Sequence, residues 1–241
     1  MTVRLSPCGQ WHISLRFDDP RNLTLPKSLN AVGLDLGITS LVTLSTGEKV
    51  ANPNHLKRQH KRLQKAQKNL SRKVKGSRNR DKSRRKVARV HQQIQDSRKD
   101  HLHKLTTRLI RENQTIVVES LSVANMVKNH KLSRAISDAG WSELVRQLEY
   151  KAQWYGRSVV KIDKWFPSSK RCGNCGHIVE KLPLNIRSWD CPSCGAHHDR
   201  DMNTAQNILA AGQAVSVCGA TVRPEESKSR KAGAMKQKPN S

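Results

Sequence analysis

Four cysteines in two closely spaced pairs constrain the fold of this 241-residue chain more than any other feature. Cys172 and Cys175 form one Cys-x-x-Cys pair, Cys191 and Cys194 form the other, and 15 residues separate the pairs. A glycine follows each pair directly and allows the tight turn that directs two thiolates at one ion. Four thiolates complete a tetrahedral shell around Zn²⁺ and leave no open position, which predicts one structural zinc ion rather than a catalytic one.

The N-terminus indicates the redox compartment of these cysteines. Residues 1–13 contain neither an apolar stretch nor a secretory cleavage pattern, and the chain has no run of about 18 apolar residues. We therefore expect a cytoplasmic protein without a membrane partner, whose thiols stay reduced. Redox-active dithiols are the remaining alternative to zinc, and His177 could replace one cysteine as a ligand. Cys8 and Cys218 have no partner at metal spacing and are expected to be free thiols.

A strongly basic segment begins at His55. The chain carries a net charge of +26, and residues 55–113 hold 21 Lys+Arg against four acids. Leu56, Leu63 and Leu70 repeat every seven residues, as on one face of a helix. The residues at 76–79 interrupt this pattern, and apolar residues at helical spacing resume after them. Two long helices folded into a hairpin are the simplest interpretation.

The charge of this hairpin predicts a polyanionic partner. Residues 57–89 hold 16 basic side chains and one acid, so opposite charges cannot neutralise the helices from within. A solvated charged face is the simpler alternative, and binding to an anionic membrane surface is disfavoured because the helices lack bulky aromatics on an apolar face. We expect contact with nucleic acid and association with the nucleoid. The leading contacts are Lys57, Arg58, Lys61, Arg62, Lys65 and Lys68.

The remaining sequence predicts an α/β domain. Residues 115–119 and 158–162 are short apolar runs rich in β-branched residues, as in buried strands. Apolar residues between them lie near helical spacing over 141–155, and Gly156 ends that helix. Residues 31–36 and 41–44 predict a β-hairpin or meander, and strand–helix–strand alternation is typical of α/β domains.

The two ends of the chain carry weaker signals. Apolar residues alternate with polar ones from Trp11 to Phe17, which predicts a strand over 11–17, and residues 18–22 form a turn or linker. The segment 223–241 is polar, basic and rich in Lys and Ser, so we expect a disordered tail.

Three acids occupy apolar or glycine-flanked positions. Asp35 lies inside the strand predicted over 31–36, Glu119 ends the run at 115–119, and Asp201 opens a predicted helix. A carboxylate in a core strand is costly unless something neutralises it. A helix cap for Asp201 and salt bridges for the other two are the simplest explanations. Three acids in two strands and at the first turn of a helix could also bring their carboxylate oxygens together as ligands of Mg²⁺. Two such ions, about 4 Å apart, can cleave a phosphodiester.

Four motifs in this order resemble the TnpB family, the OrfB-type proteins of insertion sequences related to type V CRISPR effectors. They are Val-Gly-Leu-Asp-Leu-Gly-Ile at 32–38, Val-Glu-Ser-Leu at 118–121, the two cysteine pairs, and Asp-Arg-Asp-Met-Asn at 199–203. The resemblance spans roughly residues 31–219. Thr204 departs from it, since alanine is usual there.

The resemblance implies a RuvC-like, RNase H-type mixed sheet over 31–222. The basic helical hairpin at 55–113 and a zinc ribbon at 168–197 would be insertions in it. It implies that Asp35, Glu119 and Asp201 are catalytic and hold Mg²⁺, for which Mn²⁺ can substitute. It further implies an RNA-guided DNA endonuclease whose partners are the DNA target and a guide RNA from the element's own transcript.

The N-terminal region departs from the family pattern. Family members carry a wedge-type β-barrel and a helical recognition region before the nuclease domain, whereas residues 1–30 resemble only the last strands of that barrel. We therefore expect a nuclease-domain form, with a separate polypeptide as a candidate source of the recognition region. A noncatalytic nucleic-acid-binding zinc protein that regulates its parent element is the alternative function.

Overall fold

The computed structural model describes residues 1–217, and its centre is a five-stranded mixed sheet with the strand order β5-β4-β3-β6-β7. Cys218 and the tail predicted over 223–241 lie outside the described residues. Strands β3, β4 and β5 form an antiparallel meander, whereas β3, β6 and β7 run parallel. The strands are β3 (Ala31–Leu36), β4 (Ser40–Leu44), β5 (Lys49–Ala51), β6 (Thr115–Glu119) and β7 (Ser158–Ile162).

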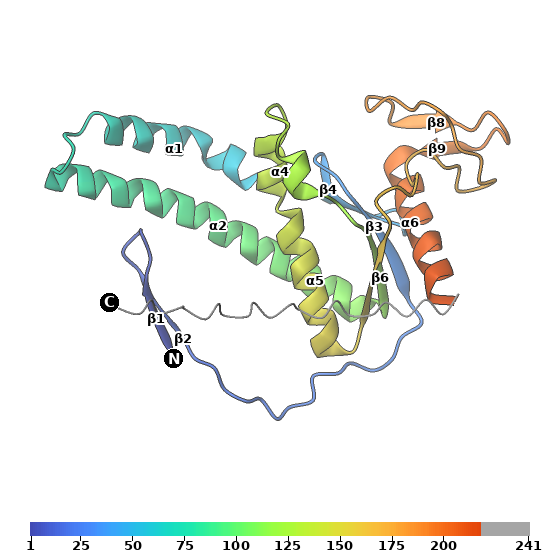
Figure 1. Cartoon of the computed structure of the whole chain (residues 1–241), viewed down its shortest axis with the longest axis horizontal. Coiled ribbons are helices and arrows are strands. Elements are labelled where there is room, and N and C mark those ends of the chain that lie inside the picture. The colour runs from blue at the N-terminus through green and yellow to red at the C-terminus, as the bar shows by residue number, and fades with distance from the viewer. Residues whose placement is uncertain (218–241) are drawn as a thin grey trace, which may run out of the picture.

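Helices cover both faces of this sheet (Figure 1). Alternate residues of β6 show the two layers, because successive side chains of a strand point to opposite faces. Ile116 and Val118 join the large core with α2 and α5, whereas Val117 packs with Ile208 of α6. The helices are α1 (His55–Ser71), α2 (Arg78–Glu112), α3 (Val123–Met126), α4 (Ser133–Ala139), α5 (Trp141–Tyr155) and α6 (Arg200–Val217).

The connection from β6 to β7 follows the prediction from the sequence. Helix α5 covers the predicted range 141–155, and Gly156 ends it with a left-handed backbone, φ 64°. Because β6 and β7 run parallel, their C-terminal ends lie at the same edge of the sheet. The end of β6, where Glu119 lies, therefore adjoins the loop that leaves β7.

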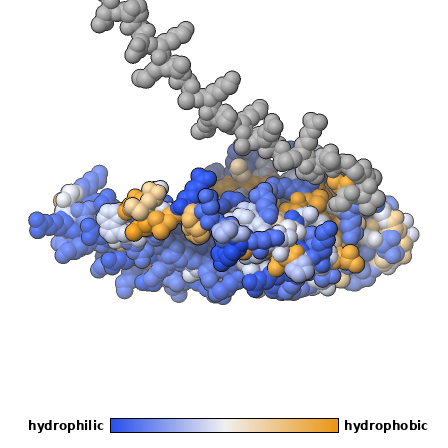
Figure 2. All heavy atoms as spheres, turned by 90° about the horizontal axis from the view of Figure 1, so that it is seen from below, coloured by the Kyte–Doolittle hydropathy of each residue, from blue (hydrophilic) through white to orange (hydrophobic). Residues whose placement is uncertain are grey.

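Helices α1 and α2 form the predicted basic hairpin, which extends away from the sheet (Figure 1). Leu63 is buried against Val90 and Ile94, so a narrow apolar seam joins the two helices. The break between the two helices lies at residues 72–77, so it begins and ends earlier than the predicted 76–79. Ser77 caps α2 by accepting a hydrogen bond from the backbone N–H of Arg80, so residues 78 and 79 are helical. Figure 2 shows that the surface at this end is mostly hydrophilic.

The N-terminal strand prediction is wrong in its length. Strands β1 (Thr2–Leu5) and β2 (Trp11–Ser14) form a separate two-stranded sheet, and β2 ends three residues before the predicted end. The register pairs Thr2 with Ser14, so β1 has no residue left to pair with position 15 or beyond. A strand without a hydrogen-bonding partner is not stable in water.

Strands β8 (Ser188–Asp190) and β9 (His197–Asp199) form a third sheet, beside the cysteine pairs. Every helix within residues 1–217 is too short or too polar to cross a lipid bilayer.

Candidate metal centre and candidate active site

The structure brings the four cysteines together, as their spacing predicts. Their sulfur atoms all lie within 4.8 Å of one another, and the Sγ–Sγ distances across the two pairs are 3.7 Å for Cys172–Cys194 and 3.6 Å for Cys175–Cys191. Four sulfurs about 2.3 Å from a tetrahedral zinc ion stand about 3.8 Å apart. The geometry and the chemistry of these donors therefore fit Zn²⁺.

Each cysteine pair lies in a turn of the same construction. The N–H of Cys172 donates to the carbonyl of His177, and the N–H of Gly176 donates back to the carbonyl of Cys172. The same two bonds recur around Cys191. Gly176 has a φ of 80°, a backbone conformation that a side chain disfavours, so the glycine is required for the turn as the sequence suggests.

A histidine that sequence reasoning missed lies against the cluster. His198 of β9 places its Nε2 atom 3.0 Å from the sulfur of Cys172, and its ring lies 4.9 Å from that of Trp189. His177, the alternative ligand suggested by the sequence, does not belong to the group of metal-ligating side chains. The position of His198, four residues after Cys194, is the signal that could have identified it.

Two of the three acids end neighbouring parallel strands. The last paired positions of β3 and β6 are Leu34 and Val118, and Asp35 and Glu119 follow them. Asp201 lies in the first turn of α6. This helix can pass directly over β3 because Gly33 has no side chain, since a Cβ there would meet the backbone of Ala205 and stand 2.7 Å from the nitrogen of Leu209.

Burial and like charges perturb the acid at the centre of this arrangement. Burial, followed by the charges of Glu119 and Asp201, raises the pKa of Asp35 to about 7, although Arg200 and Arg187 oppose the shift. Crowded carboxylates of this kind are relieved by a bound cation, and oxygen donors suit Mg²⁺. The donor chemistry therefore fits a divalent cation. In residues 1–217, however, only the cysteines form a group of three or more ligands within 4.8 Å.

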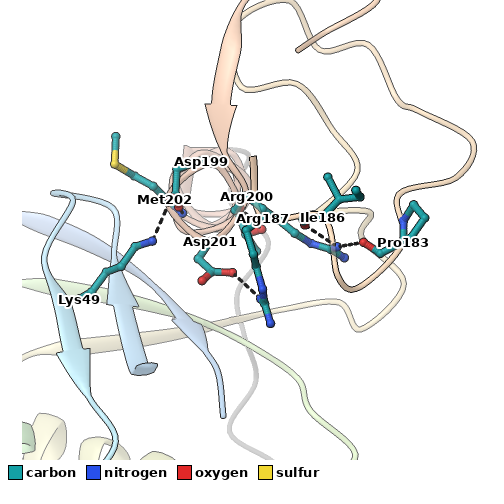
Figure 3. A network of polar contacts seen from close by, with 9 residues as sticks. Lys49, Pro183, Ile186, Arg187, Asp199, Arg200, Asp201 and Met202 are labelled. Carbon is teal, nitrogen blue, oxygen red and sulfur yellow. Dashed lines mark hydrogen bonds and ion pairs between the residues drawn. The ribbon is translucent and has the colours of Figure 1, made fainter. Parts of the chain in front are cut away.

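Glu119 and Asp201 each interact with a neighbouring side chain. The hydroxyl of Ser168 donates a hydrogen bond to Glu119, which partly offsets the rise in the pKa of Glu119 that burial causes. Arg187 approaches Asp201 at 3.4 Å, as Figure 3 shows. Within residues 1–217, neither Asp35 nor Glu119 forms a salt bridge with Lys or Arg, so the salt bridges suggested for these two acids are not found. Asp201, for which a helix cap was suggested, is the acid of the three that has such a pair.

Asp199, and not Asp201, supplies the cap of α6. Its Oδ1 atom accepts a hydrogen bond of 3.0 Å from the N–H of Met202, and its Oδ2 atom pairs with Lys49 at 2.8 Å (Figure 3). The cap explanation for Asp201 is therefore wrong, because the preceding acid already occupies the capping position. The side chain of Asp201 does not bond the start of its own helix. Its charge instead helps to raise the pKa of Asp35.

Two asparagines of α6 connect the cysteine cluster to the carboxylates. Asn203 donates to the carbonyl of Arg171 at 2.8 Å and accepts from the N–H of Gly173 at 2.9 Å. Asn207, one turn later, donates to the carbonyls of Ser168 and Arg171 at 2.9 and 2.7 Å. The segment that carries Ser168 and the first cysteine pair is thereby fixed to the helix that carries Asp201. These contacts join residues more than 29 positions apart.

An open cavity of about 450 Å³ lies beside Glu119. Its walls come from the end of β6 and from α5, and Lys161 and Arg146 contribute positive charge. Lys161 is paired with Glu149 at 2.5 Å, whereas Arg146 is paired with Glu143 at 2.7 Å. The cavity therefore opens beside Glu119, at the C-terminal end of β6.

The predicted nucleic-acid contacts all lie on the exposed surface of α1. Lys57 and Lys61 also line a second open cavity, of about 630 Å³, between α1 and α4. Its one acid, Asp138, is already paired with Arg98 at 2.9 Å. We call this cavity the basic groove; its cationic or titratable walls are Lys57, His60, Lys61, His130, Lys131 and Arg134. Sequence reasoning missed the last three, although residues 128–134 are visibly basic.

Two protein-family models match this chain. A family model described as "Probable transposase", of the OrfB type, matches residues 12–130. A second model, described as "Cas12f1-like, TNB domain", matches residues 141–208 and so includes the cysteine pairs and Asp201.

The chain belongs to the OrfB/TnpB family.

Curated TnpB-type relatives share most of this chain. A protein of Streptomyces pristinaespiralis named "Putative RNA-guided DNA endonuclease" is 58% identical over 240 residues, which is 99% of this chain and 59% of the relative. A similarly named protein of Escherichia coli K12, InsQ, is 38% identical over 90% of this chain and 57% of its own length. The chain thus spans less than two thirds of the length of these relatives.

The fold of this TnpB-type chain is similar to one in a cryo-EM structure titled as a Cas12f1–sgRNA–target DNA complex. The TM-score is 0.53 at 16% sequence identity, with 81% of this chain and 52% of that chain covered. The α/β mixed sheet predicted from the sequence is therefore shown, both by the strand order and by this similarity.

Proposed function

We propose that this chain acts in RNA-guided DNA cleavage as a TnpB-type endonuclease. The observation that carries the proposal is the convergence of Asp35, Glu119 and Asp201, three acids from separate elements, in which the charges of Glu119 and Asp201 help to raise the pKa of Asp35. Relatives named as RNA-guided DNA endonucleases support the same activity. On this proposal the sheet is the RuvC-like core of a domain over 31–222, and the segments 55–113 and 168–197 are insertions in it.

The three carboxylates would hold Mg²⁺, or Mn²⁺ in its place. Two such ions, when bound, supply an activated water and stabilise the leaving oxygen of a phosphodiester. The chain's own residues provide the rest. Ser168 orients Glu119, and Arg187 lies close enough to Asp201 to limit its movement. Asp35 must lose its proton to act as a ligand, so its pKa of about 7 matters near neutral pH.

The basic hairpin and the basic groove would bind the phosphates of the nucleic-acid partners, a DNA target and a guide RNA. Exposed lysines and arginines on α1 have no acidic partner among the ion pairs of residues 1–217, so their charge is free for phosphate. In RNA-guided nucleases the protein recognises the backbone and shape of the guide–target duplex, and base pairing reads the sequence. Contacts of this kind require positive charge but no base-specific side chains.

The four cysteines would hold one structural zinc ion. Cys172 and Cys191 are buried and the module has little apolar core of its own, consisting of Trp189 and two half-buried aliphatic residues. Metal binding would therefore supply folding free energy to this segment. Through Asn203 and Arg187 the module would also keep the start of α6 in place.

Cleavage of labelled single-stranded DNA tests the proposal. The purified chain should cleave in Mg²⁺ or Mn²⁺ but not in EDTA, and Asp35→Ala should abolish cleavage. Asp19→Ala is the matched control, because Asp19 is an exposed acid paired with Arg21 in the N-terminal linker, and it should cleave as the wild type does. Cleavage that survives Asp35→Ala would refute the catalytic assignment. Binding without cleavage would favour the noncatalytic regulator.

A further inference from the structure

An exposed tryptophan, Trp165, lies on the segment between β7 and the first cysteine pair. Trp165 has 80% of its surface exposed, and a lone exposed apolar residue is ordinarily unremarkable on a protein surface. Its surroundings distinguish it, because the backbone on both sides is tightly held. Its own N–H donates to the carboxylate of Asp163 at 2.7 Å, and the ring of Phe166 packs onto the core with Ile162 and Ile208.

The segment is also fixed to the proposed catalytic acids. Ser168 is 5% exposed, its N–H donates to the carbonyl of Phe166 at 2.8 Å, and its hydroxyl donates to Glu119. Asn207 of α6 holds the carbonyl of Ser168. Trp165 and Ser168 are three positions apart in the sequence, so their Cα atoms lie at most about 11 Å apart. The exposed indole is therefore carried by a backbone segment that hydrogen bonds hold in place near Glu119.

A cation accompanies the indole. The ammonium of Lys164 lies 4.9 Å from the centroid of the Trp165 ring. Within residues 1–217 Lys164 forms no ion pair, whereas Lys161 of the preceding strand is paired with Glu149. An aromatic face next to an unpaired cation is the usual arrangement for binding single-stranded nucleic acid, since a base stacks on the ring and the cation binds a phosphate.

We propose that Trp165 and Lys164 form a stacking site for one base of the single-stranded DNA that reaches the carboxylates. This inference rests on the proposed function for the identity of the strand. Bases of a duplex are stacked on one another and cannot offer a face to Trp165, so the site selects an unpaired strand.

Photocrosslinking tests the site directly. The full chain, loaded with zinc, is irradiated without added Mg²⁺ or Mn²⁺ together with a single-stranded DNA that contains iodouracil, and is then digested with trypsin. Crosslinks should fall on the peptide of residues 165–170, which contains Trp165 and no other aromatic residue except Phe166. Trp154, also exposed at 56% but located on α5, provides an internal control in the peptide of residues 152–157. Crosslinks distributed equally over both peptides, or absent from the first, would overturn the proposal.

Affinity provides the second readout. Trp165→Ala should weaken binding of a thymidine oligonucleotide by about tenfold, Trp165→Phe should retain most of the affinity, and Trp154→Ala should match the wild type. The loss should persist at higher salt, because stacking does not depend on counterion release, and should vanish with an abasic oligonucleotide of equal length. An equal loss on the abasic strand would refute stacking. Because Mg²⁺ and Mn²⁺ are left out of both binding tests, failure of Asp35-dependent cleavage leaves this result unaffected, and the reverse also holds.

Discussion

Gly33 of β3 lies directly against the backbone of α6, so close that a Cβ at Gly33 would stand 2.7 Å from the backbone nitrogen of Leu209. The same helix approaches β6 at Gly212, where a Cβ would stand 2.6 Å from Cγ2 of Val117. These two contacts set the distance between α6 and the sheet. They therefore determine how near Asp201 lies to Asp35.

Replacing Gly33 by alanine should displace α6. The new methyl group would meet backbone atoms, which cannot rotate away as a side chain can, so we expect a loss of about 3 kcal/mol or more in the free energy of unfolding. Gly76→Ala is the control, since Gly76 has a φ of 82° with nothing within 4 Å of a Cβ and should lose only about 1 kcal/mol from backbone strain. Urea unfolding measures both. Equal losses would show that α6 does not pack as described.

Ser168→Ala should alter the pH dependence of cleavage. The hydroxyl stabilises the ionised form of Glu119, so its removal raises the pKa of Glu119 further above its usual value. Protonated Glu119 is then more abundant at low pH, and cleavage at pH 6.5 should fall by about tenfold, with a smaller loss at pH 8.5. Ser168→Thr should restore the profile. Ser120→Ala, which changes a neighbouring hydroxyl, serves as the control; a matching shift in Ser120→Ala would contradict the role of Ser168.

Zinc content should depend on the clustered cysteines alone. The wild-type chain should contain about one zinc ion, and Cys191→Ser should lose it because three thiolates with one hydroxyl bind zinc poorly. Cys8→Ser removes an equally buried thiol outside the cluster and should leave the zinc content unchanged. Elemental analysis measures the content, and amide hydrogen exchange should rise over residues 170–199 in Cys191→Ser. Protection that stays unchanged there would show that metal does not stabilise this segment.

Charge reversal in the basic groove should weaken nucleic-acid binding and its salt dependence together. Lys131→Glu with Arg134→Glu removes two candidate phosphate contacts, so the slope of log affinity against log salt should fall in magnitude by about two. The same reversal at Lys99 and Lys104, exposed on α2 outside the groove, should change the slope less. Titration by fluorescence anisotropy at several salt concentrations measures both. Equal effects would indicate a diffuse charge rather than a groove.

Local chemistry made much of the fold predictable. Local sequence patterns predicted the β-branched strands β6 and β7, the helix with the heptad leucines (α1) and the tight turn at the glycine after each cysteine pair. The structure has each of these features where the pattern predicts it. The strand predicted through Phe17 failed because the pattern of a strand does not report whether a partner strand exists. The break predicted at 76–79 lies at 72–77 instead, because Ser77 is a strong N-cap that starts α2 at Arg78.

The surroundings of the candidate active site could not be predicted in the same way. Ser168 and Glu119 are 49 positions apart, and Asp199 and Lys49 are 150 apart, so no local pattern announces either contact. The pKa of Asp35 depends on burial and on acids from two other elements, which only the folded chain brings together. The acids themselves were identifiable because a carboxylate in an apolar strand is costly and so unusual.

Binding of Mn²⁺ to the zinc-loaded chain, measured by electron paramagnetic resonance at pH 6 and pH 8, tests most directly whether Asp35 belongs to a shared cation site. The pKa of Asp35 is about 7, so the side chain is mostly protonated at pH 6 and mostly ionised at pH 8. A cation binds the ionised form, so wild-type affinity should rise by up to about tenfold over this interval. Asp35→Asn should bind at least about tenfold more weakly at pH 8 and lose most of the pH dependence. Wild-type affinity in Asp35→Asn at pH 8 would contradict the account.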